Sequence, residues 1–367
     1  MNQTRLQKLM AEMQSKQVDG IALVPGPNMV YFSGIHSHLS ERPIVLFLPV
    51  NAPPAIIIPG LEAMKAEKAG VPTDRIFAWS DEDGYQGAFQ QASDVLNLSN
   101  WQLGVEFLHM RVLELNMIQS VAPGLATCNA DPIISTLRMV KDADEVAAME
   151  RAVAVAEAAM HKLLPQIKVG QTEKQIATML TQELMDAGAD KVSFGPIVSA
   201  GPNAASPHAI PTDRPIQQGD LLIIDWGVYV DEYPSDITRT FAVGALEAEF
   251  ERIYNAVKLS NEQGRKMAAP GVSGQDVDRA SREVIDEAGY GQYFIHRTGH
   301  GLGLEVHEPP DMVEGNTAPL QPGNVFTIEP GIYLPGRGGV RIEDDMVVTA
   351  DGVRSLTSFP RELMTVG

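Results

Sequence analysis

The second half of the chain contains an internal repeat, which constrains the fold more than any other feature. Residues 170–172 (Gly-Gln-Thr) recur as residues 271–273 (Gly-Val-Ser), 101 positions later. Residues 218–229 recur as residues 322–333, 104 positions later, and each copy carries one acidic residue at the same place. The hydroxyl residue that ends each copy of the first segment is a favourable N-cap, so each copy is expected to begin a helix. Two copies of a helix-then-strand unit predict an α+β domain with an internal pseudo-twofold repeat.

Residues 1–131 have a different pattern, in which short apolar runs alternate with helical segments. This alternation is typical of an α/β layer domain, and no glycine fingerprint for a nucleotide accompanies it. The predicted strands are Gly20–Val24, Ile44–Leu48, Ala55–Ile58, Arg75–Trp79 and Gln102–Glu106, and the predicted helices are Leu61–Ala69, Tyr85–Leu96 and Met110–Val121. A long helix is then expected from about Ala143 to Leu164. We therefore predict an α/β N-terminal domain over residues 1–131 and an α+β domain over residues 132–367.

Composition argues against several classes of partner. The formal net charge is −19 and no dense run of Lys and Arg occurs, which argues against nucleic acid. No apolar stretch is long enough for a transmembrane helix, so no membrane partner is expected. The first residues are typical of an amphipathic helix and not of a secretory signal. The single cysteine, Cys128, excludes an internal disulfide and fits a reducing compartment, so we expect a cytoplasmic protein.

The first repeat continues as a hairpin that carries two acidic residues. A turn near Val230-Asp231 would set Asp225 opposite Asp236, where like charges on one sheet face are destabilising. These acids could lie on a solvated face, where the repulsion is screened. Asp225, however, shares its face with Leu221 and Ile223, so it continues an apolar row.

The second repeat has the same arrangement. Residues 335–338 (Pro-Gly-Arg-Gly) are turn formers, and a turn centred on Gly336 would set Glu329 opposite Glu343. Opposed carboxylates in each of two matched repeats have no evident value for folding. They are expected where carboxylates surround cations.

A segment rich in histidine and glycine, residues 296–303, supplies a fifth group. Its glycines would let the backbone and the imidazole of His300 approach a crowded site. The glycines alone could indicate a phosphate loop, but residues 307–310 (His-Glu-Pro-Pro) stand where the following helix should begin. The negative charge of the four carboxylates would be balanced by two divalent ions. Mn²⁺ suits oxygen-rich ligation with one imidazole, as do Co²⁺, Fe²⁺ and Zn²⁺. Two such ions roughly 3.5–4 Å apart can hold a bridging hydroxide as nucleophile and polarise a carbonyl.

Six stretches of the chain resemble metallopeptidase family M24, which has the pita-bread fold and includes methionine aminopeptidase, prolidase, aminopeptidase P and the metal-free creatinase. They are NMVYFSG, LRMVKDADEV, DWGVYVDEYPSDITRTF, HRTGHGLGLEVHEPP, FTIEPGIY and GVRIEDD, and they span nearly the whole chain. The resemblance implies a two-metal peptidase that hydrolyses the bond preceding proline, in Xaa-Pro dipeptides or at the N-terminus of short Xaa-Pro peptides.

The resemblance also implies a role for each matching residue. Glu329 would accept and donate the proton of the attacking water, and His307 would stabilise the tetrahedral intermediate. His208 would be catalytic and, with His296 and His307, would bind the substrate, His296 near the proline subsite. Arg341 would brace a ligand carboxylate. In simpler interpretations His208 is a loop histidine, His296 only packs, and Arg341 neutralises surface acids. The implied metal ligands are Asp225, Asp236, His300, Glu329 and Glu343.

Two further features bear on the branch of the family. Glu232-Tyr233 stands where the family usually has Gly-Tyr, so an altered turn with retained ligation is expected. The N-terminal domain favours prolidase or aminopeptidase P over methionine aminopeptidase. The short chain favours a prolidase-like dipeptidase, although the sequence does not separate a dipeptidase from an aminopeptidase. In dimeric relatives a loop of this domain reaches the partner's active site. Here the corresponding candidate is Gly34–Pro43, so we expect a homodimer.

Two other interpretations remain open. One is a non-peptidase hydrolase or lyase that acts on a small amide or sulfonium compound on the same scaffold. The other is a binding protein that has kept the fold and lost catalysis.

Overall fold

The structure is a computed structural model that describes all residues, 1–367. The chain divides into two compact units, residues 1–138 and 139–367. The boundary expected at residue 131 coincides with the first residue of helix α6 (Asp131–Arg138), and the division between the units lies at the end of that helix.

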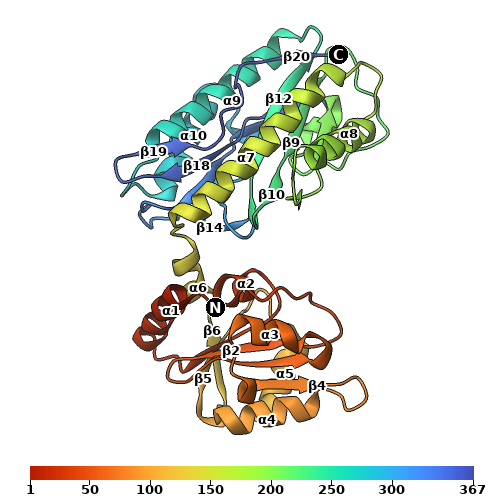
Figure 1. Ribbon diagram of the computed structural model, residues 1–367. Coiled ribbons are helices and arrows are strands. Elements are labelled where there is room, and N and C mark those ends of the chain that lie inside the picture. The colour runs from red at the N-terminus through yellow and green to blue at the C-terminus, as the bar shows by residue number, and fades with distance from the viewer. The chain divides into compact units, whose positions relative to one another are not determined.

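The first unit is a mixed α/β layer domain. Its strands are β1 (Gly20–Leu23), β2 (Val45–Pro49), β3 (Ala55–Pro59), β4 (Ile76–Trp79), β5 (Gln102–Val105) and β6 (Ala126–Asn129). Its other helices are α1 (Gln3–Ser15), α2 (Pro27–Ser33), α3 (Ala63–Ala69), α4 (Gln86–Leu96) and α5 (Val112–Val121). The strands form one sheet in the order β4-β3-β2-β1-β5-β6 (Figure 1), in which β1 pairs antiparallel with β2 and parallel with β5.

The predicted strands and helices of this unit are present within a few residues of their expected ends. Strands β1, β2 and β3 are fully buried, and Phe47, Ile57 and Leu103 pack in one apolar cluster with Phe89 of α4. Helices α2 and α6 and strand β6 were not predicted. The residues of β6 (Ala-Thr-Cys-Asn) are small or polar and largely exposed, so no apolar run marks this edge strand.

The second unit contains two related helix pairs, and the repeat predicts the second helix of each pair. Its helices are α7 (Ala143–Leu163), α8 (Glu173–Asp186), α9 (Ala248–Met267) and α10 (Gly274–Glu287). Helix α7 packs against α8, and α9 against α10 (Figure 1). Thr172 caps α8 and Ser273 caps α10, each in a capping box. The preceding glycines, Gly170 and Gly271, have φ of 91° and 86°. The repeat seen in the sequence is therefore also a structural repeat.

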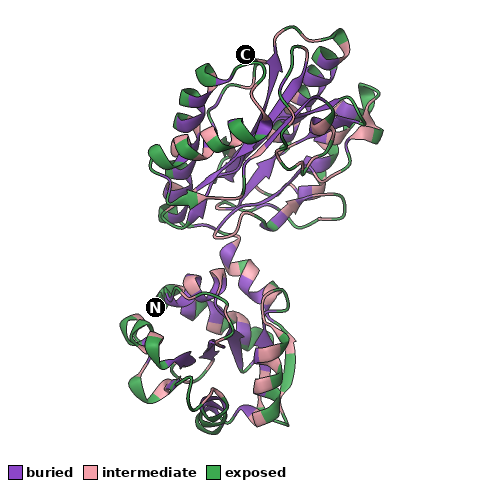
Figure 2. Cartoon of the chain, turned by 90° about the vertical axis from the view of Figure 1, so that its right-hand side faces the viewer, coloured by how far each residue is buried: buried purple, intermediate pink, exposed green.

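The strands of the second unit lie between these helices. They are β7 (Lys191–Val192), β8 (Ile197–Ala200), β9 (Leu221–Trp226), β10 (Val228–Val230), β11 (Tyr233–Pro234), β12 (Ile237–Val243), β13 (Gly299–Gly301), β14 (Glu308–Met312), β15 (Val325–Ile328), β16 (Gly331–Leu334), β17 (Gly338–Arg341), β18 (Asp344–Val348), β19 (Val353–Ser355) and β20 (Thr365–Val366). The first half forms sheets β11-β10-β7 and β12-β9-β8, and the C-terminal strand β20 pairs with β12. The second half forms sheets β14-β13-β15-β18-β19 and β16-β17. An isolated bridge between Thr238 and Glu343 also joins the halves. Figure 2 shows that the strands are largely buried while the helices expose their outer faces.

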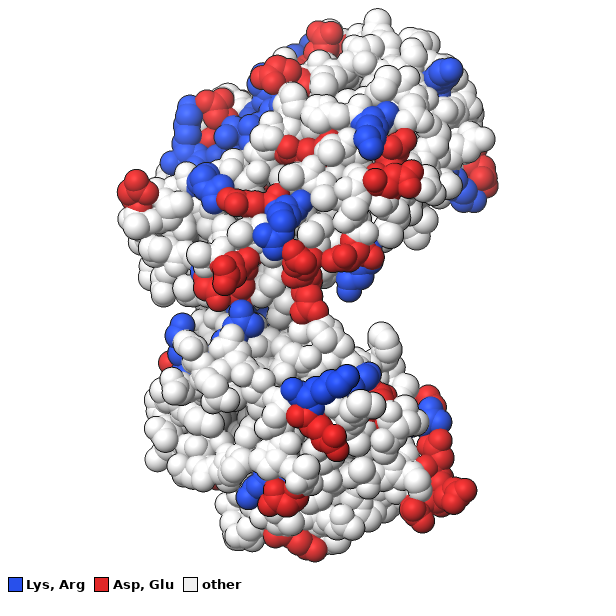
Figure 3. All heavy atoms as spheres, viewed as in Figure 1, with Lys and Arg blue, Asp and Glu red and all other residues white.

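Charged side chains of both signs are mixed on the surface. On the face drawn in Figure 3, Lys and Arg lie among Asp and Glu and form no continuous basic area. None of the helices combines the length and the apolar composition that crossing a membrane requires.

Candidate metal centre

The first hairpin differs in register from the prediction. Asp225 on β9 pairs with Thr238 on β12, so the prediction that Asp225 stands opposite Asp236 is wrong. The turn is formed by Asp231 and Glu232, one residue further along the chain than expected, which moves the register by two residues. Because side chains alternate with a period of two, this shift leaves Asp236 on the same face as Asp225.

The two turn residues explain why the register was misplaced. Asp231 and Glu232 have φ of 49° and 72°, the left-handed conformation that a two-residue hairpin turn demands and that glycine or asparagine usually supplies. Glu232 therefore occupies a conformation that glycine adopts more readily. Asp231 is a turn former, but Glu232 is not, so the sequence does not mark the second turn residue.

The second hairpin has the predicted register. Ile328 pairs with Asp344 on β15 and β18, and Gly331 pairs with Arg341 on β16 and β17. Both registers place Glu329 opposite Glu343, as expected from a turn centred on Gly336, whose φ is 71°.

His300 lies on β13, where glycines allow very close packing. A Cβ atom on Gly299 would lie 1.9 Å from the carbonyl oxygen of Thr327, and one on Gly301 would lie 2.3 Å from that of Glu308. Larger residues would push β13 away from its neighbours. The glycines thus serve the close approach predicted for them.

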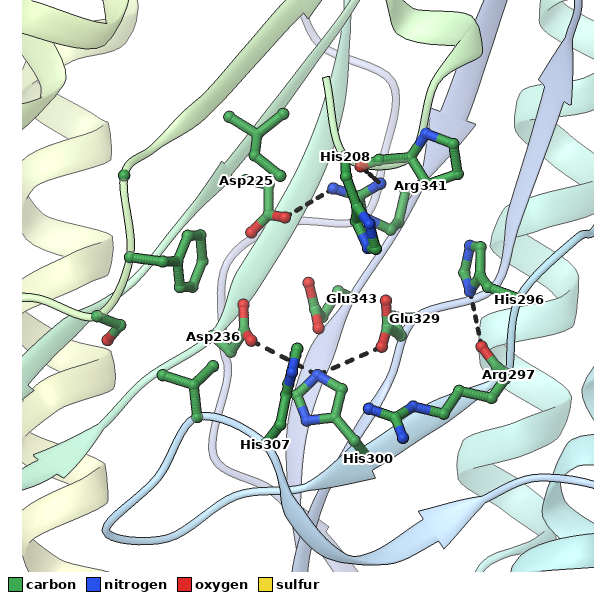
Figure 4. A pocket seen from close by; sticks show the side chains of 16 residues that line it. His208, Asp225, Asp236, His296, Arg297, His300, His307, Glu329, Arg341 and Glu343 are labelled. Carbon is green, nitrogen blue, oxygen red and sulfur yellow. Dashed lines mark hydrogen bonds and ion pairs between the residues drawn. The ribbon is translucent and has the colours of Figure 1, made fainter. Parts of the chain in front are cut away.

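The ligand atoms of the five predicted residues form two overlapping groups (Figure 4). Atoms of Asp225, Asp236 and Glu343 lie within 4.8 Å of one another, and so do atoms of His300, Glu329 and Glu343. His300 Nε2 lies 3.7 Å from Asp236 Oδ2 and 3.4 Å from Glu329 Oε1. Glu343 belongs to both groups, which is the arrangement expected of two ions that share one carboxylate.

The protein surroundings oppose the charge of these carboxyl groups. Burial, together with Glu343 and Asp225, raises the pKa of Asp236 well above its usual value. Burial and Glu329 do the same to the pKa of Glu343, and burial raises the pKa of Glu329 to about 7. Burial lowers the pKa of His300, which keeps its imidazole neutral. Cations among these groups would favour the ionised carboxylates, because opposite charges nearby lower a carboxyl pKa.

Asp225 gives independent support for a cation. Its Oδ2 accepts a hydrogen bond from Arg341 Nη2 at 2.6 Å, whereas its Oδ1 is buried without any hydrogen-bond partner. A buried carboxylate oxygen without a donor is costly unless a cation lies beside it. Carboxylates and a neutral imidazole are ligands that divalent transition ions accept. The residues present therefore fit two divalent ions.

Arg341 lies buried behind the cluster and not on the surface. Besides Asp225, its guanidinium donates to Thr238 Oγ1 at 3.1 Å, to the Tyr333 hydroxyl at 3.0 Å and to the carbonyl oxygen of Pro207 at 3.1 Å. Through these contacts Arg341 links one carboxylate of the cluster to both halves of the unit.

His296 lies beside the cluster and is connected to Arg341 through Tyr333. Its Nδ1 lies 2.7 Å from the carbonyl oxygen of Arg297, and its Nε2 lies 2.9 Å from the Tyr333 hydroxyl. Because a carbonyl only accepts, Nδ1 carries the proton and Nε2 accepts from Tyr333. Burial lowers the pKa of His296 to about 4 and raises that of Tyr333 to about 12, so both groups are neutral near neutral pH.

Two exposed histidines face the cluster (Figure 4). The ring of His307 packs edge-on against His300, with centroids 4.0 Å apart, and its ligand atom forms a further group with those of Asp236 and His300. His208 lies on the opposite side of the cluster in this view. These groups line a pocket of about 800 Å³, whose apolar lining residues are Phe194, Ile197, Pro207 and Val306.

Three polar residues that were not predicted from the sequence support the cluster. Thr238 Oγ1 donates to Glu343 Oε2 at 2.6 Å, and Thr327 Oγ1 accepts from the amide of His300 at 3.1 Å. Asp345 Oδ2 accepts from the amide of Asp236 at 3.0 Å. Each is a polar residue within a strand that is buried along its whole length. A polar residue inside a predicted buried strand is the sequence signal that could have identified it.

Comparison with known proteins places the chain in a family. The profile of "Metallopeptidase family M24" matches residues 147–350, and that of "Creatinase/Prolidase N-terminal domain" matches residues 5–140. The chain belongs to metallopeptidase family M24. It is thus a metallopeptidase of the pita-bread fold with a creatinase-type N-terminal domain, and the clustered Asp, His and Glu residues are the candidate metal site of a member of this metal-dependent family.

Several relatives resemble this M24 metallopeptidase over nearly their whole length. "Probable dipeptidase PepE" of Mycobacterium tuberculosis is 38% identical over 95% of this chain and 92% of its own. The crystal structure of a prolidase from Thermococcus sibiricus superposes with a TM-score of 0.94 at 35% identity and full coverage of both chains. That of an X-Pro aminopeptidase from Thermotoga maritima gives a TM-score of 0.86 at 30% identity, covering 98% of this chain and 99% of its own.

Proposed function

We propose that this protein hydrolyses the peptide bond before proline, in Xaa-Pro dipeptides or at the N-terminus of short Xaa-Pro peptides. The observation that carries the proposal is the pair of three-residue groups that share Glu343, in a chain whose relatives are named dipeptidase and prolidase. We assign the ligand set to the five clustered residues Asp225, Asp236, His300, Glu329 and Glu343, and we favour Mn²⁺ among the ions that this set accepts.

The chain's own groups would supply proton transfer and charge stabilisation. Divalent ions bound here would activate water and polarise the scissile carbonyl. We assign Glu329 as the group that takes the proton from water and passes it to the leaving nitrogen. His307, exposed to the pocket beside His300, would donate a hydrogen bond to the oxyanion.

We assign the recognition of proline to the neutral groups around the pocket. A nitrogen that belongs to a proline ring carries no N–H, so its subsite needs no hydrogen-bond acceptor for it. His296 is neutral with its Nε2 already bonded to Tyr333, which leaves the face of its ring for an apolar contact. His208, with Phe194 and Ile197 in the pocket lining, would enclose the rest of a small substrate.

The loop Gly34–Pro43 is a candidate for control of substrate length in a homodimer. It has no regular structure, and His36, His38 and Glu41 are exposed on it. Ser37 Oγ donates to Glu62 Oε2 at 2.8 Å, which fixes the base of the loop. Deleting residues 37–41 should change the ratio of dipeptide to tripeptide turnover. An unchanged ratio would exclude the loop from substrate selection.

Metal content and turnover of matched peptides test the proposal. The purified protein is loaded with Mn²⁺, its bound metal is counted by elemental analysis, and Ala-Pro, Ala-Pro-Ala and Ala-Ala are compared. We expect two ions per chain and selective cleavage of the proline peptides, and faster turnover of Ala-Pro would identify a dipeptidase. Metal binding without cleavage of any of the three peptides would favour a different hydrolase or lyase. Failure to bind divalent ions would refute the ligand assignment.

A further inference from the structure

A buried ion pair connects the segment before α7 with the loop that carries His307. Lys141 Nζ donates to Glu308 Oε1 at 2.6 Å, and the two side chains are only 1% and 5% exposed. Burial of two charges has a large desolvation penalty, so such a pair is weak evidence for a stabilising role. The pair lies next to the metal centre in sequence, since Glu308 directly follows His307.

Glu308 fixes the loop between His300 and His307. Its backbone pairs with Gly301 on β13, and its carboxylate packs directly against Gly303, because a Cβ there would lie 2.2 Å from Glu308 Oε1. The His307 ring packs against His300 and forms no hydrogen bond of its own. Its position therefore depends on the backbone that Glu308 anchors.

Lys141 is itself held on a rigid support. Its amide donates to the carbonyl oxygen of Gly323 at 2.8 Å, and Asn324 Nδ2 donates to that of Met139 at 3.0 Å. The next residue, Asp142, caps α7 in a capping box. The backbone of Lys141 is thus fixed at two places, just before the start of α7 and beside the turn that leads into β15.

We propose that Lys141 is a positioning residue for His307 and acts through Glu308. The inference deepens the proposed function, on which it rests, because it assigns a role to the segment LRMVKDADEV beside the same site. Lys141→Met would leave Glu308 buried without its cation and release the loop. Misplacement of a catalytic group by about 1 Å can lower the rate roughly 100-fold, so we expect a fall of about 10- to 100-fold in kcat. KM and metal content should remain as in the wild type.

A double-mutant cycle on Mn²⁺-loaded protein tests the inference. The four proteins are wild type, Lys141→Met, His307→Ala and the double variant, assayed with Ala-Pro. If Lys141 acts through His307, the double variant should have the kcat of His307→Ala, because the lysine then has nothing left to position. Independent, multiplying effects would overturn the inference. Arg151→Met is the matched control, since Arg151 on α7 is the cation of an exposed ion pair with Asp231 and its loss should leave kcat unchanged.

A second readout does not depend on activity. In metal-free protein labelled with ¹⁵N at histidine, the His307 ring signal is assigned by its loss in His307→Ala. Lys141→Met should shift or broaden this signal, whereas Arg151→Met should not, and an unaltered signal would overturn the inference. If Lys141→Met does not fold, the double variant Lys141→Met/Glu308→Gln, which removes both charges of the ion pair, takes the place of Lys141→Met in both experiments. A wild type inactive on all peptides would refute the proposed function, and the His307 signal would still decide the inference.

Discussion

Glu329→Gln should stabilise the metal-free protein near neutral pH, although the wild type should be the more stable when loaded with Mn²⁺. The substitution keeps the shape of the side chain and removes its charge. In the metal-free cluster this charge is opposed by burial, which raises the pKa of Glu329 from 4.5 to about 7. Glutamine imitates the protonated form, which the cluster accepts.

The magnitude follows from the size of this pKa change. Each pKa unit corresponds to about 1.4 kcal/mol, so the ionised carboxylate destabilises the folded metal-free state by about 3 kcal/mol above pH 7. The folded pKa lies above the unfolded one. The stability contributed by the protonated group is therefore fully present below pH 4.5 and is lost as the pH rises to about 7. For a unit of this size, 3 kcal/mol corresponds to a Tm difference of roughly 6–12 °C.

Thermal unfolding with a chelator measures the effect at both ends of this range. We expect Glu329→Gln to unfold above the wild type at about pH 8 and close to it below pH 4.5. Saturating Mn²⁺ should raise the Tm of the wild type far more than that of the variant, because ligand binding stabilises only the folded state that binds it. Glu283→Gln is the control, since Glu283 is exposed on α10. A metal-free Glu329→Gln less stable than the wild type at pH 8 would refute the reasoning.

Three further predictions follow from the geometry. Asp236→Ala and His300→Ala should abolish turnover because they remove ligands, and elemental analysis should show lost metal; full metal occupancy with an unimpaired rate would contradict the assignment. His307→Ala should retain both ions while kcat falls by about 10²–10³-fold, as for the loss of one oxyanion donor, and lost metal would instead make His307 a ligand. Gly299→Ala should separate β13 from β15, since its Cβ would lie 1.9 Å from the Thr327 carbonyl oxygen, and it should lower metal affinity. Gly352→Ala, with open space around its Cβ position, should bind metal as the wild type does.

The two hairpins show how far the sequence alone could predict the centre. Residues 335–338 contain proline and glycine, Gly336 adopts the positive φ expected of it, and the second register was predicted correctly. The first turn is formed by Asp231 and Glu232, which adopt positive φ without any glycine, and its centre lies one residue after the predicted one because Glu232 is not a turn former. The face of Asp236 was nevertheless correct, because alternation fixes the side of the sheet even when the register is wrong by two residues.

Long-range contacts were beyond the reach of sequence patterns. The alternation of side chains between the two faces of each strand placed the acids on the buried face. Nothing local indicates that Lys141 meets Glu308, 167 residues away. The polar side chains of Thr238 and Asp345 also lie within buried strands, where only the tertiary structure supplies their partners. No periodicity in the sequence indicates such partners, because they depend on which helices and strands pack together and not on residue spacing within a single element.

The repeat has a consequence for how the centre is held together. Thr238 stands two residues after Asp236, and Asp345 stands two residues after Glu343, so they occupy equivalent places in the two halves. Thr238 donates its hydroxyl to the Glu343 carboxylate, and Asp345 accepts the amide of Asp236. Each half therefore uses the same position to hold the second acidic residue of the other. Because these contacts run in both directions, neither hairpin can shift without disturbing a carboxylate of its counterpart, which is how two separate sheets can keep two groups of ligands at a fixed separation.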